Sequence, residues 1–315
     1  MSDIRIVVVG GCIVDLISYI NRFPRPGETL TGLNFAKGCG GKAANQCVMV
    51  KKLGARTAMI AKLGDDSFGH EYLENFKEMN IDSKFITLSK TSHTSTASIA
   101  VSNDGQNSII YVPGAIMELM PADIINAEDM IKNSKVLLCT FECPLPTLIT
   151  AFELAKKYGV KTVLNAAPTT DLSYETLYSL TDIICLNEIE AEDATGLPLK
   201  AVSDCADIFR ILHAKGCSTV ILTLGSKGAV FKTKGQENFS LVPAKAVAAI
   251  DCTGAGDAFM GTLVYFLSEY PSMNLSSIIE KSCEIASLSV LKKGTQSSFP
   301  NREDMPEEFF TTSDL

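Results

Sequence analysis

The stretch Asp251-Cys-Thr-Gly-Ala-Gly-Asp257 combines two glycines with a carboxylate where an apolar helical pattern begins. Gly254 and Gly256 allow a tight turn that leaves amide groups uncovered at the start of the helix. Such a helix start carries partial positive charge and suits a phosphate-type anion. Because a carboxylate repels that anion, Asp257 makes chemical sense there if it takes a proton from a hydroxyl that attacks the phosphate.

The amides of Ala255, Gly256 and Asp257 would then stabilise the charge that develops in phosphoryl transfer. A purely structural alternative has the same shape, namely a glycine-rich helix cap with an aspartate paired to the helix dipole. The likeness to a dinucleotide fingerprint is partial, because the third glycine is missing and the segment lies near the C-terminus. An apolar, β-prone run over 246–250 predicts a strand before the turn.

A second glycine-rich stretch is Gly38-Cys-Gly-Gly-Lys-Ala-Ala-Asn-Gln46. It is not a Walker P-loop, because the four-residue gap before a Gly-Lys-Ser/Thr sequence is absent. Glycines 40 and 41 instead allow close backbone approach to a small ligand, and Lys42 and Asn45 offer polar groups at the start of a helical pattern. A simple loop-to-helix cap is the alternative.

Length and composition indicate a globular protein. The 315 residues are 46% hydrophobic and 20% charged, which is ordinary for a chain with a large core. No apolar run reaches the roughly 20 residues that span a bilayer, and the first ten residues lack a secretory pattern. The net charge of −8 argues against a nucleic-acid partner. We therefore expect a protein with no membrane or nucleic-acid partner.

The ten cysteines form no C-x-x-C pair and many stand at apolar positions, such as Cys139, Cys185 and Cys217. This pattern predicts free thiols in a reducing compartment. Three isolated histidines argue against a zinc site. We expect a cytoplasmic location, with room for a nuclear fraction.

Strands and helices alternate regularly after Pro121, which predicts a parallel sheet covered on both faces. The expected fold is α/β, a Rossmann-like three-layer α/β/α sandwich with a mainly parallel central sheet. In the first third of the chain we expect strands over 4–9 and 57–62 and a helix over 68–79. Further on we expect helices near 122–132, 146–158, 173–179 and 203–214, and strands near 135–140, 160–164, 182–186 and 218–223.

Ligands of such sheets bind beyond the carboxyl ends of the strands. The polar residues at those ends are Glu142, Asn165, Asn187 with Glu190, and the segment 223–228. Each alone could be a helix cap, Asn187 especially. Asp15, in the apolar run after the first strand, is either an exposed strand residue or a ligand contact.

A hairpin over 95–102 and 108–112 and a strand near 30–35 interrupt the alternation. They predict a small appended β-sheet that serves as a lid. We expect a single domain over 1–315, with lid strands inserted at about 12–37 and 93–115. The exposed edges of this sheet favour a homodimer formed through the lid.

The motif Gly40-Gly41-Lys42-x-Ala-Asn45, paired with Asp251-x-Thr-Gly-Ala-Gly-Asp257, resembles the two signatures of the ribokinase-like (PfkB-type) sugar kinases. The resemblance covers nearly the whole chain. Further motifs fall in the expected order: Gly-x-x-x-x-Asp15, Pro-Gly-Glu-Thr, Asn187-x-x-Glu190, Thr223-Leu-Gly and Gly294-Thr-Gln-Ser-Ser298. The cysteine positions and the last motif favour the eukaryotic branch of the family.

The resemblance implies transfer of the γ-phosphoryl group of ATP to the 5-hydroxyl of D-ribose, giving D-ribose 5-phosphate and ADP. It implies Asp257 as general base and an anion hole of Gly254, Ala255 and Gly256. The implied sugar contacts are Ile13, Val14, Asp15, Gly41, Lys42, Ala43, Ala44, Asn45, Glu142 and Asp257. The implied nucleotide contacts are Asn187, Glu190, Thr223, Leu224, Gly225, Ser226, Lys227, Gly228, Gly256 and Cys283, with Glu190 near Mg²⁺.

The resemblance also implies a K⁺ ion held by Asp251, Thr253, Ser289, Lys292, Gly294 and Ser298, mostly through backbone oxygens. From the residues alone, Asp251 could instead cap the helix that starts near Ala255. The loop over 292–298 follows a helix end, and Gly294 lets its oxygens face one point. An all-oxygen site suits a hard cation, and the choice of potassium comes from the family.

The sequence departs from the family pattern in three places. Ile13 stands where a polar sugar contact is frequent, Ala43 where glycine is frequent, and Cys283 where a polar residue frequently meets the nucleotide. The alternative function is that of a sibling kinase acting on a nucleoside or a ketose. A nucleoside base would need aromatic rings to stack on, and the lid segments offer few, such as Phe35 and Tyr111. A binding regulator should have lost the base or its glycines, and an oxidoreductase should have an early G-x-G-x-x-G.

Overall fold

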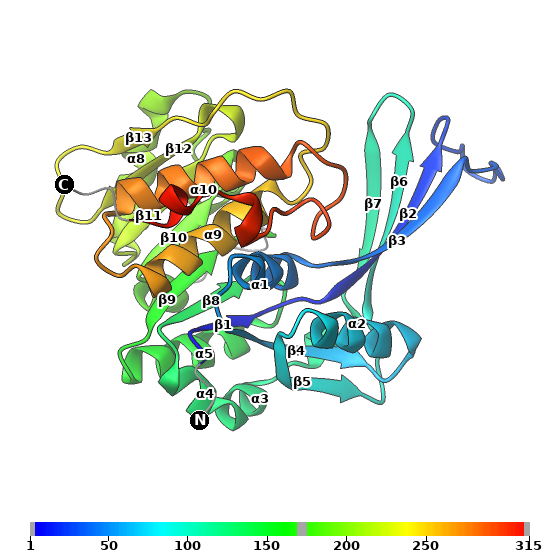
Figure 1. Cartoon of the computed structure of the whole chain (residues 1–315), viewed down its shortest axis with the longest axis horizontal. Helices are drawn as coiled ribbons and strands as arrows, with labels where there is room; N and C mark the ends of the chain where they lie inside the picture. Colours follow the sequence, from blue (N-terminus) through cyan, green and yellow to red (C-terminus); the bar gives the residue numbers. More distant parts are fainter. Residues whose placement is uncertain (1–3, 169–174, 312–315) are drawn as a thin grey trace.

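A nine-stranded sheet forms the centre of the molecule (Figure 1). The computed structural model describes residues 4–168 and 175–311. The strand order is β13 (Ser240–Val242), β12 (Ala229–Thr233), β11 (Thr219–Thr223), β10 (Ile183–Leu186), β9 (Lys161–Asn165), β8 (Val136–Thr140), β1 (Ile6–Val9), β4 (Thr57–Gly64) and β5 (Asp82–Ser89). The strands from β11 to β5 are mutually parallel, and β12 and β13 form an antiparallel edge. The predicted, mainly parallel sheet is confirmed.

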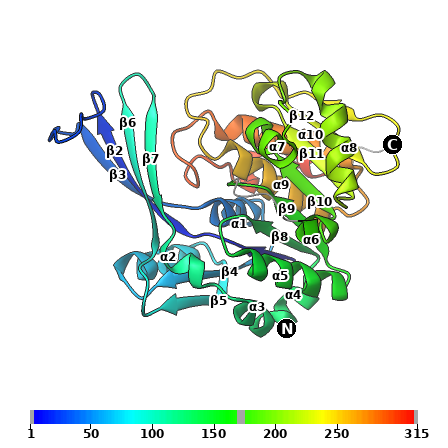
Figure 2. The ribbon, with the colours of Figure 1, turned by 180° about the vertical axis from the view of Figure 1, so that it is seen from behind.

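Helices cover both faces of this sheet (Figures 1 and 2). One layer holds α1 (Lys42–Lys52), α2 (Ser67–Glu78), α9 (Ala255–Glu269) and α10 (Leu275–Ser289). The other holds α3 (Pro121–Asn126), α4 (Glu128–Asn133), α5 (Leu145–Lys157), α6 (Glu175–Ser179), α7 (Glu188–Thr195) and α8 (Cys205–Ala214). Strand β1 shows why two cores form, since Ile6 and Val8 point into one and Val7 and Val9 into the other.

Helix α9 runs through the first core, and almost every side chain between Asp257 and Phe266 is buried. A helix that is apolar on all sides fits only where neighbours surround it. Here α1 and α10 pack against α9 and the sheet lies behind it. The body of α9 from Asp257 to Phe266 is therefore enclosed by its neighbours. No helix within residues 4–168 and 175–311 is long and apolar enough to cross a membrane.

A second sheet of four strands stands away from the main body (Figure 1). Its order is β3 (Asn34–Gly40), β2 (Ile13–Ile20), β6 (Ser95–Ser102) and β7 (Asn107–Val112), and we call it the lid sheet. The predicted hairpin forms β6 and β7, whereas the strand expected near 30–35 begins only at Asn34. In-register pairing places Gly38, Asp15, Ala97 and Tyr111 in one row across the sheet.

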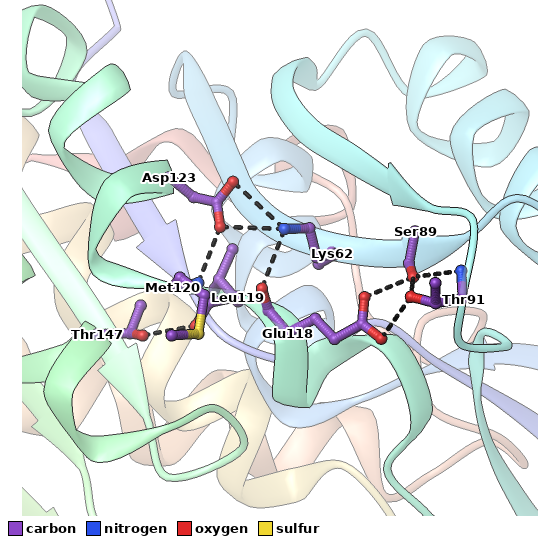
Figure 3. A network of polar contacts seen from close by, with 8 residues as sticks. All are labelled: Lys62, Ser89, Thr91, Glu118, Leu119, Met120, Asp123 and Thr147. Atoms are coloured by element: carbon purple, nitrogen blue, oxygen red, sulfur yellow. Dashed lines mark hydrogen bonds and ion pairs between the residues drawn. The ribbon is translucent and has the colours of Figure 1, made fainter.

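Polar contacts tie the base of the lid sheet to the main body (Figure 3). The chain leaves β7 through a short 3₁₀ helix, η1 (Gly114–Glu118). Lys62 of β4 donates to the carbonyl oxygen of Glu118 at 3.0 Å and to the carboxylate of Asp123 at 3.1 Å. The carboxylate of Glu118 accepts hydrogen bonds from Ser89, Thr91 and Ser92. This cluster fixes the point where the lid sheet returns to the main body.

Several local expectations were wrong. Strand β5 and the antiparallel pair β12 and β13 were not expected, and the helix near 122–132 is two short helices that meet at Ala127. The run over 246–250 is exposed and forms no strand, because the amide of Ile250 donates to the carbonyl of Val290 instead. Of the helix expected over 173–179, residues 173 and 174 lie outside the described part.

Candidate active site

A cavity of about 230 Å³ lies beyond the carboxyl ends of β9, β10 and β11. Its lining comes from these strand ends and from the starts of α1, α7 and α9. The lining residues are Lys42, Asn165, Ala167, Cys185, Leu186, Asn187, Glu190, Thr223, Cys252, Gly254, Gly256, Asp257 and Met260. The cavity therefore joins both glycine-rich stretches with the polar strand ends that the sequence singled out.

A larger cavity of about 320 Å³ lies at the opposite edge of the sheet, where the same strands begin. Lys161, Asp182 and Tyr270 are among its lining residues. None of the predicted site residues lines it. Parallel sheets bind ligands at the carboxyl edge, so the smaller cavity is the candidate active site.

Asp257 is buried in the first turn of α9, with only 8% of its surface exposed. Its Oδ2 atom accepts a hydrogen bond from Asn45 Nδ2 and its Oδ1 atom accepts one from Gln46 Nε2, each at 2.9 Å. Burial raises the pKa of Asp257, and Lys42, Gln46 and Asn45 oppose that rise. The carboxylate is thus a base of raised basicity held by two amide donors.

The backbone before Asp257 forms a helix start that can receive an anion. Gly254 has φ of 81°, and an added Cβ there would lie 2.7 Å from Thr295 Cγ2, so glycine suits both the turn and the close packing. The amide of Ala255 donates to the carbonyl of Cys252 at 3.3 Å. Within the described residues the amides of Gly256 and Asp257 have no hydrogen-bond partner.

Gly256 is exposed, and an added Cβ would meet no atom within 4 Å. The cavity side of the turn is therefore open next to the free amides of Gly256 and Asp257. The long bond of Ala255 to Cys252 makes its amide the least available of the three predicted donors.

Lys42 is the first residue of α1, and its side chain lines the cavity together with Glu190 and Asp257. Burial would lower the pKa of Lys42, but the carboxylates of Asp257, Glu142 and Glu190 raise it above its ordinary value. The ammonium group is thus charged and faces several carboxylates. The sequence assigned Lys42 to the sugar, whereas this cavity also contains the residues assigned to the nucleotide.

Glu142 lies after β8 and is buried. It accepts hydrogen bonds from the amides of Gly11, Lys42 and Ala43 at 3.1, 2.7 and 2.9 Å and from Thr140 Oγ1 at 2.9 Å. Burial raises its pKa, and these donors oppose the rise. Glu142 therefore positions the first turn of α1 and the loop after β1.

Asp15 lies on β2 beside Gly40 of β3, where an added Cβ would lie 2.2 Å from Asp15 Oδ2. Burial, followed by the charges of Glu142 and Asp257, raises the pKa of Asp15 to about 6. The structure thus gathers three carboxylates, from the lid sheet, from the end of β8 and from α9. The other predicted sugar contacts lie around them in β2 and α1: Ile13, Val14, Gly41, Ala43, Ala44 and Asn45.

Asn187 and Glu190 form a capping box at the start of α7. Asn187 Oδ1 accepts from the amide of Glu190, and Glu190 Oε2 accepts from the amide of Asn187, each at 2.8 Å. Burial raises the pKa of Glu190, while the Asn187 amide and Lys42 lower it. Asn187 therefore caps a helix and also lines the cavity.

The other predicted nucleotide contacts are spread more widely. Thr223 lines the cavity and Leu224 is buried, whereas the turn over 225–227 is exposed. Gly228 is buried beside β13. Cys283 packs in the first core and is not among the residues that line the cavity.

Asp251 connects the loop before α9 with the loop after α10. Its Oδ1 atom accepts from the amide of Thr253 and its Oδ2 atom from the amide of Gly294, each at 2.9 Å. Partial burial raises its pKa, but the bonds from Gly294 and Thr253 hold it below its ordinary value. Gly254, not Asp251, is the N-cap residue of α9, so the capping alternative was wrong.

The remaining predicted cation residues lie at the end of α10 and in the loop after it. Ser289 Oγ donates to the carbonyl of Ala286 at 2.8 Å, and Ser298 Oγ donates to the carbonyl of Thr295 at 2.9 Å. A hydroxyl that donates one bond still has lone pairs to offer a cation. The side chain of Lys292 is exposed, which leaves its backbone oxygen as the group to consider.

Two glutamines of the site were missed. Gln46 donates to Asp257, and Gln296 Nε2 donates to Asn45 Oδ1 at 3.0 Å. Both lie inside motifs that the sequence had already singled out. Gln46 is a polar residue within a run of buried positions on α1, but its spacing in the sequence does not point to Asp257.

Comparison with known proteins identifies the family. Residues 3–302 match the pfkB family carbohydrate kinases. The chain belongs to this family. Its relatives include the ribokinase of Mus musculus, 41% identical over 306 residues that cover 97% of this chain and 94% of the relative. The deoxyribokinase of Salmonella typhi is 36% identical over 305 residues, covering 96% and 97%.

A solved structure of Arabidopsis thaliana ribokinase complexed with ribose and ATP has a similar fold. Its TM-score is 0.88 at 28% identity, and the match covers 95% of this chain and 96% of that one. The pfkB fold of this chain, including its second small sheet, is thus that of known carbohydrate kinases.

Proposed function

We propose that the chain transfers the γ-phosphoryl group of ATP to the 5-hydroxyl of D-ribose, giving D-ribose 5-phosphate and ADP. The position of Asp257 carries the proposal, because a buried carboxylate lies beside two free amides at one cavity. The mouse relative and the ribose and ATP named for the Arabidopsis structure support the choice of substrates.

Asp257 accepts the proton of the 5-hydroxyl while that oxygen forms a bond to the γ-phosphorus. The bond between the γ-phosphorus and the bridging oxygen breaks, and ADP leaves with the electron pair. The amides of Gly256 and Asp257 and the ammonium of Lys42 stabilise the charge on the transferred group. Asp257 then releases its proton to solvent. This chemistry requires positioning and electrostatics rather than a covalent intermediate.

The ribose hydroxyls are bound between the lid sheet and α1. Asp15 supplies a carboxylate from β2, and Asn45 supplies an amide from α1. Removal of one hydrogen-bond partner of a sequestered polar group costs roughly 1–3 kcal/mol. Asp15→Ala should therefore raise the KM for ribose strongly and the KM for ATP little.

A magnesium ion fits beside Glu190. Mg²⁺ commonly uses one or two carboxylates together with substrate phosphates. Within the described residues no cluster of three His, Cys, Asp or Glu side chains could hold a metal alone. Within the described residues Glu190 Oε1 accepts no hydrogen bond, and Glu190 lines the cavity, so its carboxylate can reach an ion carried by the nucleotide. The ion would neutralise phosphate charge when bound.

A potassium ion fits at the junction of the loops before α9 and after α10. The carboxylate of Asp251, the hydroxyl of Ser298 and the backbone oxygens of both loops are oxygen donors of the kind a hard cation takes. Thr253, Ser289, Lys292 and Gly294 complete the set. The ion would strengthen the contact between the loops and so hold the amides at the start of α9.

Two copies of the chain associate through the lid sheet. Both edge strands carry exposed apolar side chains: Phe35 on β3 is 61% exposed and Ile110 on β7 is 67% exposed. Open strand edges of this kind can pair with a second copy. The molar mass in solution, measured by light scattering, should be that of a dimer, and Ile110→Lys should shift it toward the monomer.

The function is tested with a substrate panel in ATP, Mg²⁺ and K⁺. Ribose, 2-deoxyribose, fructose and adenosine are compared by ADP formation, with product mass determined in parallel. We include 2-deoxyribose because one relative is a deoxyribokinase. Ribose should have the highest kcat/KM and give a 5-phosphate. A higher kcat/KM for another substrate would assign the chain to a sibling kinase.

A further inference from the structure

Gln46 is a polar residue at a fully buried position. It has 0% exposure and lies on α1 between buried residues such as Ala44 and Val48. Its Nε2 atom donates to Asp257 Oδ1 at 2.9 Å. Its Oε1 atom is buried and has no hydrogen-bond partner within the described part of the chain. The whole side chain is therefore committed to one hydrogen bond.

This arrangement is unfavourable for folding alone. A buried amide oxygen without a donor loses its hydration and gains nothing in return. A methionine has nearly the same length and would fill the space without that loss. Rotation of the amide would not help, because Oε1 would then face the carboxylate oxygen of Asp257 and Nε2 would lose its acceptor. The orientation of Gln46 is set by Asp257.

The second oxygen of Asp257 is fixed from the same helix. Asn45 Nδ2 donates to Oδ2, and Asn45 is itself held by Gln296 from the loop after α10. Neighbouring amides thus hold one carboxylate oxygen each. Two bonds define the plane of a carboxylate, whereas a single bond would leave it free to rotate. Each oxygen keeps a further lone pair for a substrate proton.

We propose that Gln46 is a positioning residue for the reaction, which orients the Asp257 carboxylate and keeps it ionised. The inference rests on the proposed function in that it takes Asp257 as the base. Gln46 does not touch substrate. It acts by fixing Oδ1 of Asp257 and by stabilising the anionic form of the carboxylate. Its unpaired amide oxygen lowers the stability of the fold, so the residue serves the reaction rather than folding.

The test is Gln46→Met, measured for kcat, KM, pH profile and Tm. Displacement of a catalytic group reduces turnover by up to about 10²-fold, so kcat should fall about 10- to 100-fold with little change in the KM for ATP. Loss of the donor raises the pKa of the base, so the acidic limb of kcat should move to higher pH. The Tm should stay equal or rise. A lower Tm with an unchanged pH profile would make Gln46 a structural residue and overturn the inference.

Thr262→Val is the matched control, because Thr262 is buried on α9 and donates only to the carbonyl of Ala258. It should leave the pH profile unchanged. A second variant, Gln46→Glu, keeps the volume and donates one proton to Asp257 while it is protonated. Its kcat should fall at alkaline pH, where that proton is lost. A profile identical to the unmodified protein would count against the inference.

The two proposals fail in different ways. If the unmodified protein phosphorylates none of the panel sugars, the proposed function fails. If Asp257→Asn loses turnover but Gln46→Met and Gln46→Glu keep full turnover and the same pH profile, the base stands and the role of Gln46 is wrong.

Discussion

Asn45 Nδ2 lies 2.9 Å from Asp257 Oδ2, and the two residues are 212 positions apart in the chain. This bond joins the first glycine-rich motif to the second at the reacting carboxylate. It also means that Asn45 is already engaged with the base through its amide nitrogen. A sugar hydroxyl that approaches Asn45 is thereby placed next to Asp257, which is the relationship that proton transfer requires.

The junction between Asp251 and Gly294 predicts activation by monovalent cations. Turnover should rise severalfold or more when K⁺ replaces Na⁺, Li⁺ or tetramethylammonium at equal ionic strength. Asp251→Ala should reduce this response, because both loops lose their shared carboxylate. Asp15→Ala should keep the same ratio of rates between salts, even though its rate is lower. Equal rates of the unmodified protein in all four salts would show that no activating potassium ion binds at this junction.

Asp15 predicts a pH-dependent effect on stability. Its pKa of about 6 lies above the ordinary value of 3.8, so the folded state resists its ionisation. The protonated Asp15 carboxyl therefore favours the folded state over the unfolded state at low pH. This contribution to the free energy of unfolding is lost as the pH rises through about 6. Asp15→Asn should therefore raise the Tm at pH 7.5 and change it little at pH 4.5.

Asp104→Asn is the control for this measurement. Asp104 lies in the hairpin of the same sheet, and Ser102 followed by Gln106 lowers its pKa. Its removal should not raise the Tm at either pH. An equal effect of Asp15→Asn at both pH values would contradict the raised pKa.

Replacement of Lys42 should shift the pH profile of catalysis. Its charge lowers the pKa of Asp257 against the effect of burial. Lys42→Met should therefore move the acidic limb of kcat to higher pH and raise the KM for ATP, because the phosphates lose a counter-charge. Lys51→Met, near the other end of α1, is the control and should leave both unchanged. A rise in the KM for ribose alone would place Lys42 at the sugar, as its motif first suggested.

Replacement of Lys62 should lower the stability of the fold without reducing phosphoryl transfer. Its ammonium group bonds both Glu118 and Asp123, and the Lys62 and Asp123 side chains are each 17% exposed. Lys62→Met should lower the free energy of unfolding by roughly 1–3 kcal/mol, since partly buried polar groups lose their partner. Lys77→Met breaks an exposed pair with Glu74 and should cost less than about 1 kcal/mol. Urea denaturation measures both, and equal losses would show that the cluster does not anchor the lid sheet.

Much of the fold could be predicted because it depends on local patterns. The buried strands of the central sheet are short apolar runs, and α9 follows directly from an apolar stretch after two glycines. Strand β5 was missed because Asp82–Ser89 contains a lysine and no clear alternation, and it becomes a strand only by pairing with β4. The run over 246–250 shows the converse, since its apolar residues have no neighbouring strand to pair with and remain exposed without forming a strand.

The residues of the site also fall into those that local sequence patterns indicate and those that they do not. Asp257, Lys42 and Asn187, which line the cavity, could be selected from the sequence because each lies in a recognisable motif or at a strand end. The roles of Gln46 and Gln296 could not be found, because their partners lie 211 and 251 residues away in the chain. The position of a glutamine within a motif does not report a contact with a residue so distant in the chain. Only the packing of α1 against α9 and the loop after α10 brings Gln46 to Asp257 and Gln296 to Asn45.

The role of Asp257 as the base is tested by the turnover of Asp257→Asn with ribose and ATP. Nucleotide affinity is measured by calorimetry, and the Tm is compared with that of the unmodified protein. We expect kcat to fall about 10²- to 10⁴-fold, the usual contribution of a positioned base, while nucleotide affinity and Tm are kept. An Asn variant that folds, binds ATP and turns over within a few fold of the unmodified protein would contradict the assignment of Asp257 as the base.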